Sequence, residues 1–508
     1  LDFLSTEKEL ETLLKGLPLN EISMHFKGSH SYSVLIELLK SYCKKHQIDC
    51  ANLKGSFNFD SFSYRLLNGD YYNSFEDNMS ELKCLLETVS NSLPNFKVVT
   101  INGQNFHNAG STLVQELGFT LSLAHEYLVQ MLEKGLNAEQ VLPYLRISFG
   151  IGSSYFPEIA KIRAARLLWS QIVKEYASLD LAKIEIHSET STWNKTIFDY
   201  NNNILRSTTE AMSAILGGSD SVNTLPFDSI FKKSDNFSER ISRNIQHIIK
   251  EEAYFNKVAD PAAGSYYIET LTASIAEHAW KLFVEIEEKG GFKSIIESGL
   301  IFEEIEKVSQ KKDLNISTRK TTILGVNQYP NLGEIMIDKL ENPVEPAKSK
   351  TVLKLYRGSQ AFEELRFATS NYVMNGGVRP KVYLAQFGNL AMRKARAQFI
   401  TNFFGIVAFE IIDAEPVNNV DWTVKHILES KADIVVFCSS DDEYSTIAPE
   451  ITKMLKEEDS EISVVVAGNP MEFSDVLIKA GVDEFINVKT NTFECLKKYQ
   501  EKMGIKLV

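Results

Sequence analysis

The stretch RISFGIGSSYFPEIAKIRAARLLWSQIVKEY, residues 146–176, indicates how this chain folds. Residues 146–152 form a short, mostly apolar run that is typical of a strand. From residue 156 to residue 176, apolar side chains return every three or four residues, as on one face of an amphipathic helix. A short strand followed by a longer helix is the repeating unit of an α/β protein, in which crossover helices join parallel strands.

The same unit recurs on both sides of this stretch. The strands predicted before residue 340 lie at residues 21–26, 53–59, 97–103, 146–152, 183–190, 221–227 and 321–327. Such a series, without a glycine-rich nucleotide loop, favours a (β/α)8 barrel of the TIM type over an open sheet. One strand is missing from the series, and we expect it upstream of Leu1 or represented only by residues 1–3.

A second α/β domain is predicted after a linker. Residues 341–351 (ENPVEPAKSKT) are polar and contain two prolines, which indicates a linker. A helix at residues 359–374 follows, and then strands at residues 381–386, 407–412, 434–438, 463–467 and 484–488. This pattern predicts a flavodoxin-like domain, whose ligand would bind beyond the strand ends at residues 386–396, 439–444 and 468–472. The expected division is a barrel domain at 1–340, a linker at 341–358 and a flavodoxin-like domain at 359–508.

The composition excludes several classes of function. Apolar residues make up 44% of the 508 residues and charged residues 24%, and the net charge is −13. Nucleic-acid binding is not expected, because it needs clustered Lys and Arg. No apolar run approaches the ~20 residues that span a bilayer, so no membrane segment is predicted. The five cysteines are scattered without a CxxC pair, as in a protein with reduced thiols, and we expect a cytoplasmic location.

General sequence motifs give little information about the function. The chain has no Walker loop, GxGxxG, HExxH or GxSxG. His187 and Glu189 form an HxE pair, but no PCxxC accompanies it, so no metal site is predicted. Lys161, Arg163 and Arg166 predict a solvated or salt-bridged helix face.

Aromatic and acidic residues that could suggest a binding site also have structural explanations. Trp169, Trp193 and the aromatic residues Tyr155 and Phe156 of SYFPE are predicted to be core residues rather than ligands. The acidic run 441–443 is predicted to be a polar loop after a strand rather than a cation site.

Longer stretches are more informative. GIGSSYFPEIAKIRAARLLW (150–169), HSETSTWNKTIFDYNNNILRSTTEAM (187–212), FSERISRNIQHIIKEEA (237–253), VADPAAGSYYIETLT (258–272) and LGVNQYPN (324–331) closely resemble the acyl-CoA mutase barrel of the methylmalonyl-CoA mutase family. Residues 9–26 and 108–128 extend the resemblance, which continues collinearly into a cobalamin-binding-like domain. It implies a (β/α)8 barrel that threads coenzyme A along its axis, joined to a flavodoxin-like cobalamin domain.

The resemblance also shows where the second domain departs from catalytic members. In those proteins an Asp-x-His-x-x-Gly motif after the first strand supplies the cobalt-ligating histidine and its aspartate partner. The matching stretch here, from Asn389 to Ala395, has neither residue. Asp441 replaces an apolar residue beside the nucleotide tail, where an unpaired buried carboxylate would be costly. Ala467 replaces the first glycine of a Gly-Gly pair. No cofactor is therefore expected on this chain.

The barrel departs from the catalytic pattern as well. Where catalytic members have Ser-Gly-Tyr-His, this chain has Gln104 at the tyrosine and Asn105 at the histidine, and Asn105 cannot titrate. His107 lies two residues further on and is not at the catalytic position. Glu189 replaces a substrate-facing glutamine, and Leu225 replaces an asparagine. No catalytic residue is expected.

Two positions of the family pattern are retained. Arg146 and Ser148 match the Arg-x-Ser that contacts coenzyme A and substrate in catalytic members, which implies residual acyl-CoA binding. Alternatively, Arg146 pairs with a neighbouring acid. The sequence does not choose between these two roles.

The resemblance implies that this chain is the non-catalytic small subunit of a heterodimer. Its partner would be a catalytic large subunit that carries adenosylcobalamin and interconverts (R)-methylmalonyl-CoA and succinyl-CoA. Acyl-CoA would bind this chain weakly or not at all. The alternatives are an active acyl-CoA mutase with altered specificity and a stand-alone module that binds coenzyme A.

Overall fold

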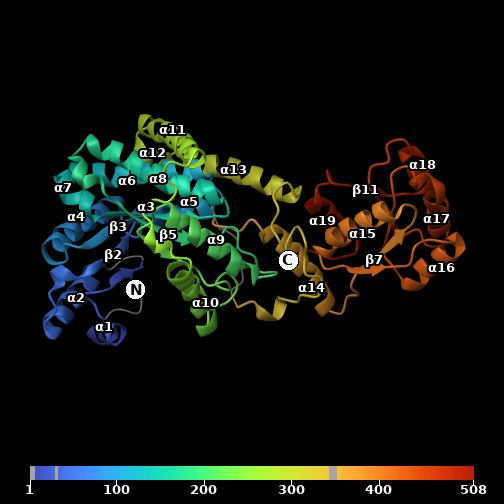
Figure 1. The fold of residues 1–508 in the computed structure, drawn as a ribbon, viewed down its shortest axis with the longest axis horizontal. Coiled ribbons are helices and arrows are strands. Elements are labelled where there is room, and N and C mark those ends of the chain that lie inside the picture. The colour runs from blue at the N-terminus through green and yellow to red at the C-terminus, as the bar shows by residue number, and fades with distance from the viewer. Residues whose placement is uncertain (1–5, 29–31, 342–351, 508) are drawn as a thin grey trace.

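The computed structural model of the chain describes residues 6–28, 32–341 and 352–507. It has two lobes, each built around one parallel sheet, with α13 and α14 between them (Figure 1). The possible strand at residues 1–3 and most of the predicted linker, residues 342–351, lie outside the described residues.

The first lobe contains a sheet of six parallel strands in chain order. These are β1 (Ser23–Phe26), β2 (Lys54–Phe59), β3 (Phe96–Asn102), β4 (Leu145–Ile151), β5 (Glu185–Thr190) and β6 (Ser221–Asn223). Six of the seven strands predicted before residue 340 are confirmed, and β6 is shorter than expected. Within the described residues, β1 and β6 are the two edges of an open sheet rather than neighbours in a closed barrel.

This sheet is strongly curled. Arg146 on β4 donates one hydrogen bond to Ser221 on β6, and its Nη1 lies 3.3 Å from Nδ1 of His25 on β1. One guanidinium can reach both edge strands only if the edges bend toward each other. The sheet therefore has the curvature of a barrel wall, in agreement with the predicted fold class.

Helices cover the convex side of the sheet (Figure 1). The helices of this lobe are α1 (Glu7–Leu14), α2 (Tyr32–His46), α3 (Ser61–Asn68), α4 (Phe75–Ser92), α5 (Gln104–Asn108), α6 (Leu113–Glu133), α7 (Ala138–Val141), α8 (Tyr155–Lys174), α9 (Asn202–Leu216), α10 (Asn236–His247), α11 (Tyr266–Glu288), α12 (Gly291–Glu297) and α13 (Leu300–Ser317). Alternation along β4 sends Leu145, Ile147 and Phe149 into the core beneath the helices. Arg146 and Ser148 consequently face the concave side.

The predicted strand at residues 321–327 is wrong. These residues form turns, with only one isolated bridge, between Leu324 and Gln328. The Asn327 amide closes the turn, because its oxygen accepts from the backbone N–H of Ile323 and its nitrogen donates to the carbonyl of Ile316. Ile323 and Val326 are apolar because they join the core of the second lobe, which gives the same local pattern as a strand.

Of two predictions about α8, one is confirmed and one needs correction. Lys161, Arg163 and Arg166 are all salt-bridged as expected, although Lys161 is fully buried. Trp169 is buried as predicted, but Phe156 is 49% exposed and is not a core residue.

The second lobe has five parallel strands, all of them predicted. They are β7 (Lys381–Gln386), β8 (Glu410–Asp413), β9 (Ile434–Cys438), β10 (Ser463–Ala467) and β11 (Glu484–Ile486), in the order β11-β10-β9-β7-β8. The helices are α14 (Gln360–Met374), α15 (Leu390–Gly405), α16 (Val420–Ser430), α17 (Tyr444–Glu458), α18 (Ser474–Ala480) and α19 (Thr492–Lys502). Numbered within the lobe, the strand order is 2-1-3-4-5, that of flavodoxin.

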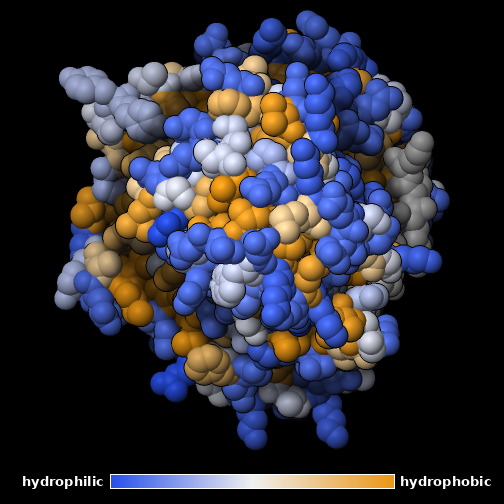
Figure 2. Space-filling view, turned by 90° about the vertical axis from the view of Figure 1, so that its right-hand side faces the viewer, coloured by the Kyte–Doolittle hydropathy of each residue, from blue (hydrophilic) through white to orange (hydrophobic). Residues whose placement is uncertain are grey.

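The loops beyond the carboxyl ends of these strands are open to solvent. Leu390, Met471 and Val488, which follow β7, β10 and β11, are 62%, 78% and 80% exposed. The end view of this lobe shows apolar side chains among a largely polar surface (Figure 2). In the described part of the chain no helix is long and apolar enough to cross a membrane.

Candidate functional site

The concave face of the first sheet holds Arg146, which is only 4% exposed. Its Nη1 donates to Ser56 at 2.7 Å, its Nη2 to Ser221 at 2.9 Å, and its Nε lies 2.8 Å from Oε1 of Glu185. Of the two roles proposed for this residue, the ion pair with a neighbouring acid is present. With His25 on β1, the guanidinium has protein partners on four strands besides its own, and Ser148 is buried beside it on β4.

Two neutral histidines lie beside this arginine. Burial, and then the charge of Arg146, lower the pKa of His25 to about 4 and that of His187 to about 3. The rings are held by serines: Nδ1 of His25 lies 2.8 Å from Ser56, and Nδ1 of His187 lies 2.9 Å from Ser221. The cluster is thus internally paired, with Glu185 as the counter-charge of Arg146.

At the end of β3, Gln104 is turned into the protein. Its amide donates to the side-chain oxygen of Asn102 at 2.8 Å, and Asn102 in turn donates twice to the buried carboxylate of Asp60. Gln104 is 6% exposed, while Asn105, the next residue on α5, is half-buried. Gln104 therefore belongs to a hydrogen-bonded chain rather than to an open substrate surface.

Glu189 and Leu225 lie at the ends of β5 and β6. Oε2 of Glu189 accepts a hydrogen bond from Asn223 at 2.8 Å, and the backbone N–H of Leu225 donates to the Thr190 hydroxyl at 2.9 Å. Both residues are half-buried. The structure therefore brings Glu189 and Leu225 together at neighbouring strand ends, as the family pattern implies.

A buried charge network next to this region was not predicted from the sequence. Lys161 on α8 lies 2.6 Å from Glu116 and 2.7 Å from Glu158, and all three side chains are 0% exposed. Glu116 also accepts from the backbone of Gly150, while His107 donates to or accepts from the Ser191 hydroxyl at 2.7 Å and faces Glu116 at 3.6 Å. A signal was present in the sequence, since Lys161 falls on the apolar face of the helical period.

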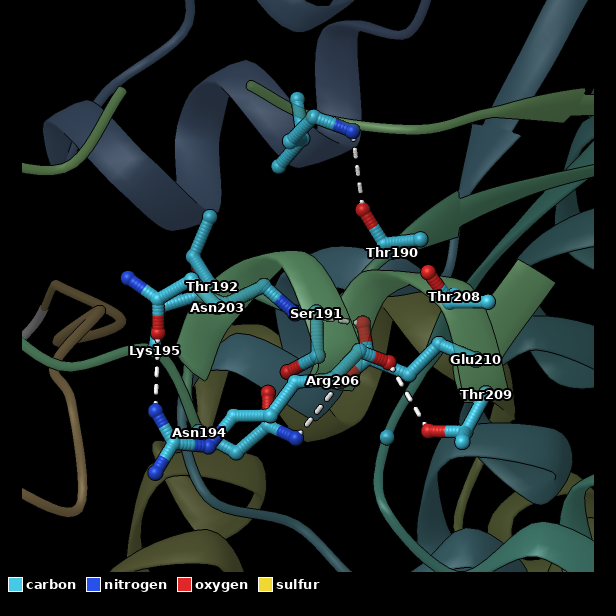
Figure 3. A network of polar contacts seen from close by, with 12 residues as sticks. Thr190, Ser191, Thr192, Asn194, Lys195, Asn203, Arg206, Thr208, Thr209 and Glu210 are labelled. Carbon is cyan, nitrogen blue, oxygen red and sulfur yellow. Dashed lines mark hydrogen bonds and ion pairs between the residues drawn. The ribbon is translucent and has the colours of Figure 1, made fainter. Parts of the chain in front are cut away.

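A second network of polar contacts, also not predicted, holds the segment after β5 against α9 (Figure 3). The Lys195 ammonium lies 2.6 Å from the Glu210 carboxylate, which also accepts from Asn194 at 2.7 Å. Burial lowers the pKa of Lys195 and raises that of Glu210. Arg206 and Asn203 hold the same segment through Thr196. This side of the first lobe is therefore rigidly cross-linked.

In the second lobe, the loop after β7 is filled by the carboxylate of Glu443. Glu443 accepts from the hydroxyls of Ser439 and Ser440, each at 2.6 Å, and from the backbone N–H of Asn389. These hydrogen bonds, first those of the serines, lower the pKa of Glu443 to about 2. A methyl group placed on Gly388 would lie 2.0 Å from this carboxylate, so the Glu443 side chain packs directly against the Gly388 backbone.

Arg396 occupies the neighbouring opening, above the carboxyl ends of β9 and β10. Its Nη1 donates to the carbonyl of Ala467 at 2.7 Å, and its Nη2 lies 3.0 Å from Asp441. A methyl group on Gly468 would lie 2.3 Å from this guanidinium. Asp441 avoids the cost of an unpaired buried carboxylate, because its side chain is 48% exposed and paired with Arg396.

The stretch from Asn389 to Ala395 forms the start of α15. The Asn389 side chain caps this helix by accepting from the backbone N–H groups of Ala391 and Met392. Among the described residues, no group of three or more His, Cys, Asp or Glu side chains is arranged to hold a metal ion.

A curled parallel sheet followed by a flavodoxin-type sheet is the architecture of a barrel enzyme with an appended cofactor-type domain. The chain belongs to the methylmalonyl-CoA mutase family, since the family model for methylmalonyl-CoA mutase matches residues 4–368.

Comparison with individual proteins shows which members of this family the chain is similar to. The chain is 40% identical to the methylmalonyl-CoA mutase small subunit of Porphyromonas gingivalis, over 98% of this chain and 80% of that protein. It is 30% identical to the small subunit of Streptomyces virginiae, over 98% of this chain and 78% of that protein. It is also 30% identical to the large subunit of Porphyromonas gingivalis, over 70% of this chain and 51% of that protein.

Proposed function

We propose that this chain is a non-catalytic small subunit that supports a catalytic large subunit of methylmalonyl-CoA mutase. The large subunit would hold adenosylcobalamin and interconvert (R)-methylmalonyl-CoA and succinyl-CoA. This chain would hold no cobalamin and would contribute through its fold and its surface. The observation that carries the proposal is the pair of openings in the second lobe, because the chain's own side chains fill both of them.

The groups in these openings do not fit the cofactor. A cobalt ligand in this loop must be a neutral imidazole, whereas the loop presents the ionised carboxylate of Glu443. Admitting a nucleotide tail would require breaking the contacts of Glu443 with the serines and those of Arg396 with Ala467 and Asp441. Both charged groups would then lose their present partners. We derive no catalytic step through this group.

The first lobe supports the same proposal. Gln104 and Asn105 can form hydrogen bonds, but neither can transfer a proton near neutral pH. Glu189 places a carboxylate among the positions that would face an acidic acyl group. These features count against an active mutase of altered specificity, while the engagement of Arg146 by Glu185 counts against a stand-alone module that binds coenzyme A.

The test uses both full-length chains. Co-expressed small and large chains are expected to elute as a 1:1 complex at ten micromolar in size-exclusion chromatography with light scattering. In equilibrium dialysis, the small chain alone is expected to take up no adenosylcobalamin at micromolar concentration, with the large chain as the positive control. A stoichiometric red complex of the small chain would contradict the absence of a cofactor. Separate elution with a fully active large chain would contradict the supporting role.

A further inference from the structure

One surface of the first lobe exposes a group of aromatic side chains. Phe156 from the first turn of α8 is 49% exposed, and Tyr254, Tyr266 and Tyr267 from the segment before and at the start of α11 are 59%, 93% and 57% exposed. Val258, in the same segment, is 60% exposed. We call these five residues the aromatic surface. The ring of Phe156 meets that of Tyr267 edge to face at 5.6 Å, so α8 and the start of α11 contribute neighbouring rings to this surface.

The segment that carries most of this surface has little support from its own chain. Not one residue between 251 and 267 is buried. Two non-glycine residues in it, Tyr254 and Asp260, have left-handed backbone angles, with φ of 57° and 44°. Such conformations are costly and persist where the surroundings hold them in place. A second protein packed against this segment would supply stabilising contacts that the segment lacks within its own chain.

The charges next to the aromatic surface are already balanced. Arg163 on α8 forms ion pairs with Asp260 and, at 2.8 Å, with Glu269. Lys250 and Glu251, at the edge of the surface, also pair with each other at 3.0 Å. Exposed apolar side chains with paired charges beside them are the layout of a protein interface.

From these observations we propose that the aromatic surface docks the catalytic large subunit. The inference rests on the proposed function and says where the partner binds. At roughly 200 Å² for a whole aromatic side chain, the exposed parts of the four rings amount to about 500 Å². A standard interface buries about 800 Å² on each partner, so these rings would form most of its centre. Tyrosine is enriched among residues that dominate binding energy.

The test compares two matched double variants. Tyr266→Ser with Tyr267→Ser removes the centre of the aromatic surface, whereas Met471→Ser with Val488→Ser removes apolar side chains of 78% and 80% exposure from the second lobe. Because all four side chains are exposed, both variants are expected to melt like the wild type. Affinity for the purified large chain is measured by sedimentation velocity. We expect the tyrosine variant to bind at least about 100-fold more weakly and the control to stay within about threefold.

The possible outcomes are distinct. Wild-type affinity of the tyrosine variant would overturn the inference and leave the proposed function intact. A wild-type small chain that forms no complex would contradict the proposed function itself. If the tyrosine changes abolish self-association of the small chain but not its complex with the large chain, the occupant is a second copy and the inference is wrong. Hydrogen exchange gives a second readout, with slower exchange at residues 254–267 expected in the complex.

Discussion

Replacing Lys161 by methionine is expected to destabilise the first lobe severely. Methionine keeps a side chain of similar length and removes the ammonium group. Glu116 and Glu158, both 0% exposed, would then face each other without their shared cation. Removing one partner from a buried ion pair costs about 3–5 kcal/mol. For a lobe of this size that corresponds to a fall in melting temperature of about 6–10 °C.

The effect should depend on pH in a definite direction. Burial alone would raise the pKa of Glu116, but the charges of Lys161 and His107 hold it below its ordinary value of 4.5. In the wild type this carboxylate therefore adds stability above its ordinary pKa and loses it as the pH falls through the lowered value. In Lys161→Met burial prevails and the pKa rises. The deficit should then be largest at pH 7 and shrink as the pH falls through the raised value.

The assay is thermal and urea unfolding, followed by the fluorescence of Trp169, which is 1% exposed on the same helix. The matched control is the triple variant Glu116→Gln, Glu158→Gln, Lys161→Met, which carries no buried charge and should recover most of the loss. A loss below about 1 kcal/mol at pH 7 would refute the reasoning. So would a deficit that is unchanged between pH 7 and pH 4.

Two further variants test the other clusters. Asn105→His is expected to yield no mutase activity, even with adenosylcobalamin present, because Gln104 stays in place of the tyrosine and, under the proposed function, the second lobe holds no cofactor; measurable succinyl-CoA would contradict this. In Arg146→Met the pKa of His187, lowered to about 3 by burial and then by Arg146, should rise but remain below 6.5, because burial persists; an NMR titration that returns the ordinary value would show that burial is not its main cause.

The amino-acid sequence predicted most strands of both sheets, but not that the first sheet is open and six-stranded within the described residues. All five strands of the second sheet and six of the first lie close to their predicted positions, because a strand of a parallel sheet is buried on both faces and reads as a short apolar run between helices. Residues 321–327 carry the same run and are not a strand. Their apolar side chains pack into the core of the second lobe. A local apolar pattern does not show which part of the structure will bury those side chains.

The resemblance also implies which catalytic positions of the family are replaced, because each replacement changes a residue type at a recognisable place. It did not show what the substituted residues do. Asp441 is paired because Arg396, the residue directly after the altered stretch 389–395, lies 3.0 Å from it. Glu443 lies in the connection after β9, and its carboxylate contacts the loop after β7. Arg396 and Asp441 are 45 residues apart in the chain, and Asn389 and Glu443 are 54 residues apart. Only the tertiary structure brings the members of each pair together.

Burial was the other property that the tertiary structure decided. Lys161 and Phe156 lie on the same helix, and their types suggest the opposite of what is found, with the lysine fully buried and the phenylalanine half exposed. Lys161 is buried because Glu116 from α6 and Glu158 meet it there, and Phe156 is exposed because the segment before α11 leaves that end of α8 uncovered. Local periodicity determines the face of a helix on which a residue lies. The neighbouring elements determine whether that face is covered and which charges it meets.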